Sequence, residues 1–419
     1  MKIAVVGGGS TYTPELVDGL GRMQDVLPVE ELVLVDPAAD RLALVGDFGR
    51  RILDRLDHSA KLTTTTDLDS ALDGVGAVLL QLRVGGQAAR LEDETWPLEC
   101  GCVGQETTGA GGFAKAIRTV PVVLDIAERV RAAAPDAWII DFTNPVGIVT
   151  RALLQEGHRA VGLCNVAIGF QRSFAAWLEV APDSVELDHV GLNHLTWERA
   201  ATVDGVDRLP ELLAGHGPEV ADSLGLPLEL LVALGVVPSY YLRYYYAHDE
   251  VVSEQRATGS RAARVAEIEQ ELLSLYADPT LDEKPALLME RGGAYYSEAA
   301  IQLTASLLGS GRAGSRQVVN LRNDGTLPFL PDDAVIEVPA RIDHSGMRAM
   351  EIAPLTPLYA GLVAHVTAYE HLALDAALRG GYERVFQALL AHPLVGQVDT
   401  AHGLADRLIA HNRRHLPWA

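Results

Sequence analysis

The stretch that decides the fold is KIAVVGGGSTYTPELVDGLGRMQDVLPVEELVLVD, residues 2–36. It opens with an apolar run at Lys2–Val6 that ends in glycines, which is typical of a short β-strand. Helical spacing follows from Pro14 to Val26, and proline favours the first turn of a helix. A second apolar run, Glu31–Val35, ends in an aspartate. This order of strand, glycine turn, helix and strand predicts a βαβ unit that binds a dinucleotide.

The glycine turn has the residue types that a pyrophosphate needs. Glycines let the backbone turn tightly and approach a ligand, and the N–H groups at a helix N-terminus attract negative charge. Asp36 is placed to accept a hydrogen bond from a ribose hydroxyl, which favours NAD over NADP. Tyr12 stands where a third glycine is usual, so a plain glycine turn with a helix cap is the alternative interpretation. The residues expected to bind NAD are Gly7, Gly9, Ser10, Thr11 and Asp36.

The same alternation of strand-like and helix-like segments continues to about residue 165. Repeated β-α units predict a parallel sheet with helices on both faces, so we expect a Rossmann-like domain over residues 1–165. Its further segments are a helix at Arg41–Leu56 and strands at Ala77–Leu80, Trp138–Phe142 and Ala160–Leu163.

The second half, residues 166–419, has a different pattern. Its strand-like and helix-like segments do not alternate regularly, which predicts a mixed α+β domain of the lactate and malate dehydrogenase kind. The turn Asp204-Gly205 is typical of a hairpin. The expected elements are strands at Val185–Val190 and Leu195–Val203 and helices at Arg261–Tyr276, Tyr296–Leu308 and Pro357–Leu378.

The composition of the chain excludes several classes of binding partner. The formal net charge is −22, from 34 basic and 56 acidic residues, so nucleic acid and anionic membranes would be repelled. No apolar run of about 18 residues predicts a membrane span. Three cysteines are too few for a disulfide framework, and the N-terminus reaches the glycine turn within ten residues, unlike a signal peptide. We therefore expect a reduced, cytoplasmic protein.

Polar residues follow several predicted strands, where ligands of a parallel sheet gather. Asn144 and Cys164-Asn165 each come directly after an apolar run, and His194 lies between two strand-like runs. Cys164 and His194 are suitable ligands for a divalent metal, although a buried structural cysteine and a scaffolding histidine are the plainer alternatives. The segment 105–112, QETTGAGG, is expected to be a flexible polar loop facing the cleft, and Cys100-Gly101-Cys102 is expected to be structural.

Five of the twelve tyrosines lie within residues 239–246, SYYLRYYY. An amphipathic helix that uses tyrosine for packing explains most of them. One could instead act as a general base, provided that nearby positive charge lowers a phenol pKa that is ordinarily about 10.

Seven motifs in this order resemble family 4 of the glycoside hydrolases, in its 6-phospho-β-glucosidase branch, over nearly the whole chain. They are GGGSTYTPEL (7–16), GQETTGAGGF (104–113), DFTNP (141–145), GLCNV (162–166), GLNHL (191–195), YLRYY (241–245) and RGGAYYS (291–297). The resemblance implies oxidation of sugar carbon 3 by NAD⁺, loss of the carbon 2 proton, expulsion of the aglycone, addition of water and return of the hydride. Enzymes of this family are exceptions to the paired-carboxylate mechanism of glycosidases.

The resemblance also implies roles for individual residues. Cys164 and His194 would hold Mn²⁺ or another divalent metal, Tyr241 would remove the carbon 2 proton, and Glu106 would support the basicity of the site. Asn165 favours β-substrates, because α-specific members tend to carry an acidic aspartate beside the cysteine; the leaving-group acid stays unidentified. The implied substrate-binding residues are Arg90, Asn144, Asn165 and Arg261, with the arginines close to the phosphate.

The expected partner is a phosphorylated disaccharide or an aryl 6-phospho-β-glucoside, and the expected assembly is a homodimer or homotetramer. Other functions remain open at this point. An NAD-dependent dehydrogenase of the malate or lactate type would share the first half of the fold, and a non-catalytic dinucleotide sensor would bind NAD without turnover. Within the family, a 6-phospho-α-glucosidase or a galacto-configured specificity is the alternative.

Overall fold

The structure is a computed structural model that describes residues 1–292, 295–309 and 314–419. Gly293 and Ala294 of the RGGAYYS motif lie outside the described residues. Within the described part, the first half of the chain forms six parallel strands in the spatial order β6-β5-β4-β1-β2-β3. The strands are β1 (Lys2–Val6), β2 (Glu31–Val35), β3 (Lys61–Thr65), β4 (Val75–Leu80), β5 (Trp138–Asp141) and β6 (Ala160–Gly162).

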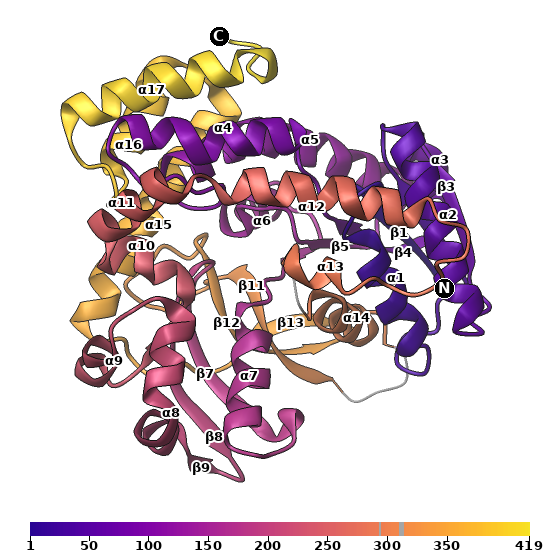
Figure 1. Cartoon of the computed structure of the whole chain (residues 1–419), viewed down its shortest axis with the longest axis horizontal. Coiled ribbons are helices and arrows are strands. Elements are labelled where there is room, and N and C mark those ends of the chain that lie inside the picture. The colour runs from indigo at the N-terminus through magenta and orange to yellow at the C-terminus, as the bar shows by residue number, and fades with distance from the viewer. Residues whose placement is uncertain (293–294, 310–313) are drawn as a thin grey trace.

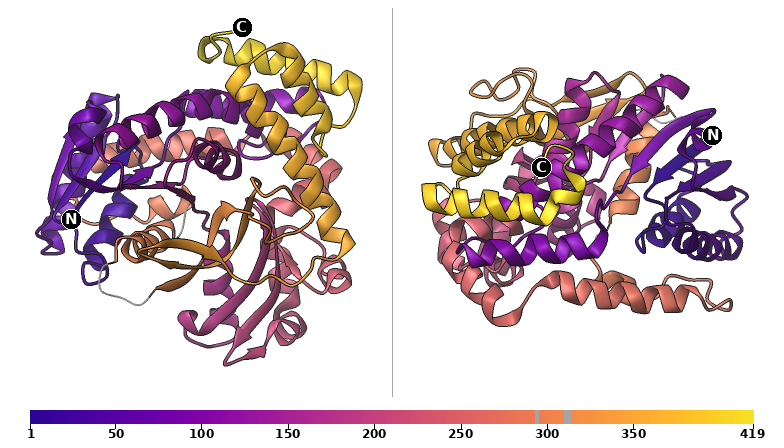
Figure 2. Two further views of the ribbon diagram at one scale, coloured as in Figure 1. Left: turned by 180° about the vertical axis from the view of Figure 1, so that it is seen from behind. Right: turned by 90° about the horizontal axis from the view of Figure 1, so that it is seen from above.

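Helices cover both faces of this parallel sheet, as predicted (Figures 1 and 2). On one side α1 packs against α2 and α14, and on the other α5 packs against α4, α6 and α15. The helices of this half are α1 (Thr13–Arg22), α2 (Ala39–Arg55), α3 (Leu68–Leu72), α4 (Gly86–Glu99), α5 (Gly109–Ala133) and α6 (Val146–Gln155). The first helix ends four residues before the predicted Val26, because the chain turns at Met23 to bury Leu27 before β2.

The strand order places a topological switch point beside β1. The chain runs outward from β1 to β2 and β3 and then crosses back to β4 on the other side of β1. Loops that leave β1 and β4 therefore diverge and leave a crevice at the carboxyl edge of the sheet. The glycine turn that follows β1 lies at this crevice.

The second half continues the same sheet with antiparallel strands rather than building a separate one. Strand β11 pairs with β6, and β12, β7, β8 and β10 follow in order. Asp204 and Gly205 have φ values of 50° and 79°, as the predicted hairpin turn requires. The strands are β7 (Val185–Leu192), β8 (Leu195–Val203), β9 (Val206–Asp207), β10 (Val237–Pro238), β11 (Ser315–Arg322), β12 (Val335–Asp343) and β13 (Gly346–Ala349).

The three helices predicted in this half are present as α12, α14 and α15. Figure 1 shows α12 running across the molecule beside α4, which it contacts. The helices are α7 (Val166–Trp177), α8 (Leu209–Leu224), α9 (Leu228–Leu234), α10 (Arg243–Tyr246), α11 (His248–Thr258), α12 (Arg261–Tyr276), α13 (Leu287–Glu290), α14 (Tyr296–Leu307), α15 (Pro357–Arg379), α16 (Tyr382–Ala391) and α17 (Val398–Asn412). In the described ranges, none of the helices has the length and apolar character needed to cross a membrane.

The parallel strands end at Gly162, but backbone hydrogen bonds continue into β11. The two predicted domains, residues 1–165 and 166–419, therefore share one continuous sheet. The boundary at residue 165 stays a prediction.

The glycines at 109–112 are not part of a flexible loop, contrary to our expectation. Helix α5 begins at Gly109, and the polar loop before it ends at Thr108. A Cβ on Gly111 would lie 2.2 Å from the Asp93 carbonyl oxygen and 2.4 Å from that of Gln105. These glycines therefore let the start of α5 pack closely against α4 and the preceding loop.

Candidate active site

A polar cavity of about 720 Å³ opens at the switch point, over the carboxyl ends of β1, β4 and β5. Most of the predicted site residues line it. They are Gly7, Gly9, Ser10, Asp36, Arg90, Glu106, Asn144, Asn165, Tyr241 and Arg261. Residues more than 250 positions apart in the sequence thus meet at one cavity, as the strand-end argument predicted.

The glycine turn and Asp36 form the nucleotide end of the cavity. Gly7 has a φ of 88°, and a Cβ there would lie 2.6 Å from the Gln81 carbonyl oxygen, so only glycine fits. The Asp36 carboxylate accepts hydrogen bonds from the N–H groups of Gly9, at 3.1 Å, and Ala38, at 2.9 Å. This arrangement suits a dinucleotide. The carboxylate can accept a hydrogen bond from a ribose hydroxyl, and the glycine turn lets a pyrophosphate approach the backbone closely.

Thr11 contributes differently from the other residues of the turn. Its side chain is buried, and its hydroxyl donates to the Glu269 carboxylate at 3.2 Å. Glu269, on α12, also accepts from Gln87 at 2.8 Å and pairs with Arg41 and Arg291 at 3.2 and 3.1 Å. Thr11 therefore ties the glycine turn to α12 and does not line the cavity.

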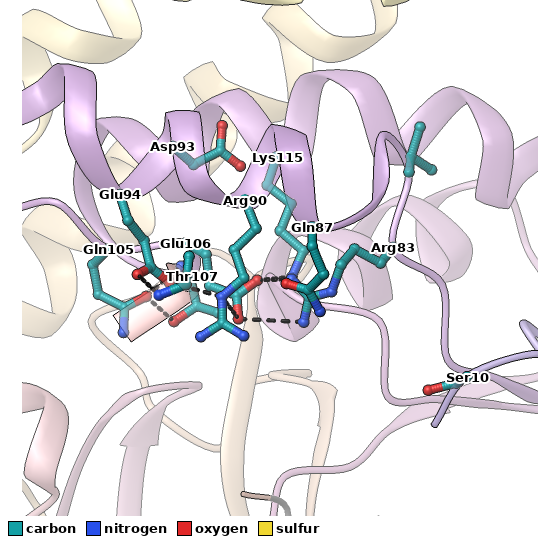
Figure 3. A network of polar contacts seen from close by, with 12 residues as sticks. Ser10, Arg83, Gln87, Arg90, Asp93, Glu94, Gln105, Glu106, Thr107 and Lys115 are labelled. Carbon is teal, nitrogen blue, oxygen red and sulfur yellow. Dashed lines mark hydrogen bonds and ion pairs between the residues drawn. The ribbon is translucent and has the colours of Figure 1, made fainter. Parts of the chain in front are cut away.

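Glu106 lies among three cations at the opposite wall (Figure 3). It pairs with Arg83, with Lys115 at 2.8 Å and with Arg90 at 3.2 Å. Burial alone would raise the pKa of Glu106, but these cations, Arg83 first, hold it well below its usual range. Burial lowers the pKa of Lys115 to about 8, against the opposing effect of Glu106. Glu106 is thus a fixed anion that organises the cationic wall.

Sequence reasoning missed Arg83, Lys115, Glu269 and Arg291, all of which line the cavity. Arg83 follows β4 closely, so the strand-end argument could have found it. Lys115 and Glu269 lie within helices, and no local pattern marks them.

Cys164 and His194, the two predicted metal ligands, lie near the Tyr241 side chain. The imidazole of His194 stacks on the Tyr241 ring with centroids 3.7 Å apart and an interplanar angle of 13°. The charge of Cys164 acts on the Tyr241 hydroxyl, and the side chains of Tyr296 and Asn193 lie near the Cys164 thiol. Cys164 borders a second cavity of about 350 Å³, whereas Tyr241 and Tyr296 line the first. His194 therefore contacts the predicted base, and Cys164 is near enough for its charge to act on it.

The donor set suits a divalent ion. Among the described residues, His194 Nδ1 is buried without a hydrogen-bond partner, and burial lowers the pKa of His194 to about 4, so the ring is neutral and has a lone pair to give. Burial, reinforced by the Glu337 charge, raises the pKa of Cys164 to about 12, so a cation must favour the thiolate. In residues 1–292, 295–309 and 314–419 no group of three or more His, Cys, Asp or Glu side chains could hold a metal. A two-ligand site leaves coordination positions for substrate oxygens.

The predicted substrate residues differ in exposure. Asn144 Oδ1 is buried and has no hydrogen-bond partner in the part of the chain that the structure describes, so it can accept from a sugar hydroxyl. Arg261 is exposed at the cavity and donates to the Glu290 carbonyl oxygen at 3.2 Å. Asn165, which directly follows Cys164 in the chain, also lines the cavity. Their roles stay predictions.

The fold and the cavity define an α/β protein of the dinucleotide-binding class. Malate dehydrogenase from Salinibacter ruber shares this fold, with a TM-score of 0.55 at 18% identity over 90% of this chain and 98% of that one. The predicted fold class is confirmed.

Comparison with known proteins identifies the family. The model of the family 4 glycosyl hydrolases matches residues 2–180, and that of their C-terminal domain matches residues 189–395. A probable 6-phospho-β-glucosidase of Bacillus subtilis is 37% identical, over all of this chain and 97% of that protein. A structure of the 6-phospho-β-glucosidase from Thermotoga maritima with manganese, NAD⁺ and glucose-6-phosphate has a TM-score of 0.91 at 32% identity, over 99% of both chains. The chain belongs to family 4 of the glycosyl hydrolases and is a glycosidase, which excludes the dehydrogenase and sensor alternatives.

Proposed function

We propose that the protein hydrolyses 6-phospho-β-glucosides, with NAD and a divalent metal ion such as Mn²⁺ as catalytic cofactors. The observation that carries the proposal is the position of Tyr241, which lines the cavity of the glycine turn while its ring stacks on His194. A sugar in this cavity would have the base and the cofactor turn around it, with the predicted metal ligand His194 stacked on the base. The β-specificity rests on Asn165 and on the resemblance to the Bacillus subtilis relative.

The charge of the cavity supports an anionic substrate. Six cationic side chains and three acidic ones are among its described lining residues, in a protein whose net charge is −22. The local potential is therefore opposite in sign to that of the whole molecule. Arginine binds phosphate through paired N–H donors, so Arg90 and Arg261 suit the sugar phosphate, while the glycine turn suits that of the dinucleotide.

The chemistry that the two cofactors supply when bound is oxidation of sugar carbon 3 and polarisation of the resulting ketone. Tyr241 takes the proton from carbon 2, which the ketone has made acidic. Burial, and next the charge of Cys164, raises the pKa of Tyr241 well above its usual range, so the base works only beside positive charge. Loss of the proton expels the aglycone from carbon 1, and Asn144 orients a sugar hydroxyl through its buried oxygen.

The test is turnover of p-nitrophenyl 6-phospho-β-glucoside by protein stripped of NAD and metal. Activity should require both NAD⁺ and Mn²⁺, and no NADH should accumulate because the hydride returns. The unphosphorylated glucoside should be a poor substrate, and the α-anomer and the galacto-isomer test specificity. Hydrolysis that persists without both additives would refute the mechanism. Preference for the α-anomer would refute the β-assignment alone.

The proposal also covers the cellular compartment, the natural substrate and the oligomeric state of the protein. All three cysteines are free thiols, which supports work in the reducing cytoplasm. The natural substrate would be a phosphorylated disaccharide or aryl glucoside. A homodimer or homotetramer stays a prediction from the family resemblance, and light scattering coupled to size exclusion tests it.

A further inference from the structure

A row of four residues crosses the sheet where its two halves join. Glu337 on β12 lies opposite Gly191 on β7 and opposite Asn320 on β11, and Asn320 lies opposite Gly162 on β6. Gly162 precedes Cys164 by two positions, and Gly191 precedes His194 by three. The Glu337 side chain therefore comes from a strand that lies between those leading to the two predicted metal ligands.

Glu337 is the centre of a buried polar network. One carboxylate oxygen accepts from the amide groups of Asn193, at 2.9 Å, and Asn320, at 2.8 Å. The other accepts from His189 Nε2 at 3.1 Å, and His189 Nδ1 donates to Glu198 at 2.5 Å. Glu198, His189 and Glu337 are all at most 1% exposed.

The network ends beside the predicted metal ligands. Asn193, whose amide donates to Glu337 at 2.9 Å, directly precedes His194 in the chain, and its side chain also lies near the Cys164 thiol. The hydrogen bond between Glu337 and Asn193 therefore holds the turn that carries His194, and the buried Glu337 carboxylate adds negative charge on this side of the predicted metal ligands.

The ionisation of the network follows from its contacts. Burial alone would lower the pKa of His189, but Glu198 and Glu337 raise it to about 10, so the ring is an imidazolium. Hydrogen bonds, that of His189 foremost, keep the pKa of Glu337 low despite burial. Apolar side chains of similar volume could replace these buried charges without loss of stability, because buried ion pairs seldom stabilise a protein more than well-packed apolar side chains do. A charged network here therefore calls for a functional reason.

We propose that Glu337 is a positioning residue for the divalent ion: by holding the Asn193 amide it fixes the turn that carries His194, and its buried charge favours a cation at Cys164 and His194. This inference rests on the proposed function. It assigns Glu337 no direct metal bond, in keeping with the finding that the described residues hold no three-member ligand cluster. Residues that orient metal ligands typically change metal affinity by about 10–100-fold when replaced.

The experiment measures Mn²⁺ binding by electron paramagnetic resonance, and NAD⁺ binding by calorimetry, on the full chain. The Glu337→Gln variant should raise the Kd for Mn²⁺ about 10–100-fold and leave the Kd for NAD⁺ within about twofold. The control is Glu370→Gln, because Glu370 on α15 is also a buried glutamate but takes no part in the hydrogen bonds that join Glu198, His189, Glu337, Asn193 and Asn320. It should change neither constant.

A second variant guards against misfolding of the first. Asn193→Ser removes the amide that Glu337 holds next to His194 but keeps the buried charges, and it should also raise the Kd for Mn²⁺. The inference is overturned if both variants bind Mn²⁺ as the wild type does, or if NAD⁺ affinity falls in parallel with Mn²⁺ affinity. Absence of Mn²⁺ binding by the wild-type protein would instead overturn the proposed function, and the inference with it.

Discussion

Replacement of Asp36 by alanine tests the nucleotide end of the cavity. In the structure the carboxylate accepts from the N–H groups of Gly9 and Ala38 and faces the cavity. With NAD bound, we expect it to accept from a ribose hydroxyl as well. A hydrogen bond to a charged group contributes about 1.5–3 kcal/mol, so Asp36→Ala should weaken NAD⁺ binding roughly 10–150-fold.

The same change should shift the preference between cofactors. Arg41 lines the cavity next to Asp36, and its Nε donates to the Gly9 carbonyl oxygen at 2.6 Å. Once the carboxylate is gone, this guanidinium remains to attract the 2′-phosphate of NADP⁺, and the negative charge of Asp36 no longer repels that phosphate. The ratio of the NADP⁺ and NAD⁺ dissociation constants should therefore fall.

Isothermal titration with each cofactor measures both effects. Asp40→Ala is the matched control, because Asp40 is an exposed carboxylate on the first turn of α2 and does not line the cavity. An NAD⁺ dissociation constant within twofold of the wild-type value would refute the role of Asp36. Equal weakening of both cofactors would show that the change had only damaged the turn.

Three other predictions concern catalysis, pH and packing. Cys164→Ser should abolish nearly all Mn²⁺-dependent turnover of the phosphoglucoside while NAD⁺ still binds; full activity would contradict the metal site. Burial raises the pKa of Glu370 to about 7 in the folded protein, above its unfolded value of about 4.3. Its contribution to stability is thus lost as pH rises between these values, and Glu370→Gln should flatten urea-unfolding stability over that window. Gly111→Ala should lower the free energy of unfolding by about 1–3 kcal/mol, because the new Cβ overpacks the site. Gly169 lies on α7 with nothing within 4 Å of a new Cβ, so Gly169→Ala should raise the free energy of unfolding by up to about 1 kcal/mol. Equal unfolding midpoints for the two variants would argue against the steric explanation.

The sequence predicted those parts of the fold that rest on buried apolar runs. Strands β1, β2 and β8 have the predicted bounds, because most of their residues are buried in the core. Strand β3 was missed because its sequence, KLTTT, is polar and only Leu62 in it is buried, as suits the edge of a sheet.

The candidate site was predictable where the parallel sheet itself places the residue. Asn144 and Cys164 follow strands, and the end of a parallel strand is a position that a pattern can reveal. Lys115 and Glu269 reach the cavity from the middle of helices, through packing between distant segments. The role of Gly111 depends on two carbonyl oxygens of other segments, and sequence alone does not show such a contact.

The join between β6 and β11 has a consequence for protein engineering. If the nucleotide-binding half were cut out and fused to another partner, β6 would lose its neighbour and expose a row of unpaired backbone groups. Bare strand edges recruit other chains and promote aggregation. The half would therefore need a new strand to shield that edge, and a flexible tether alone would yield an aggregation-prone fragment.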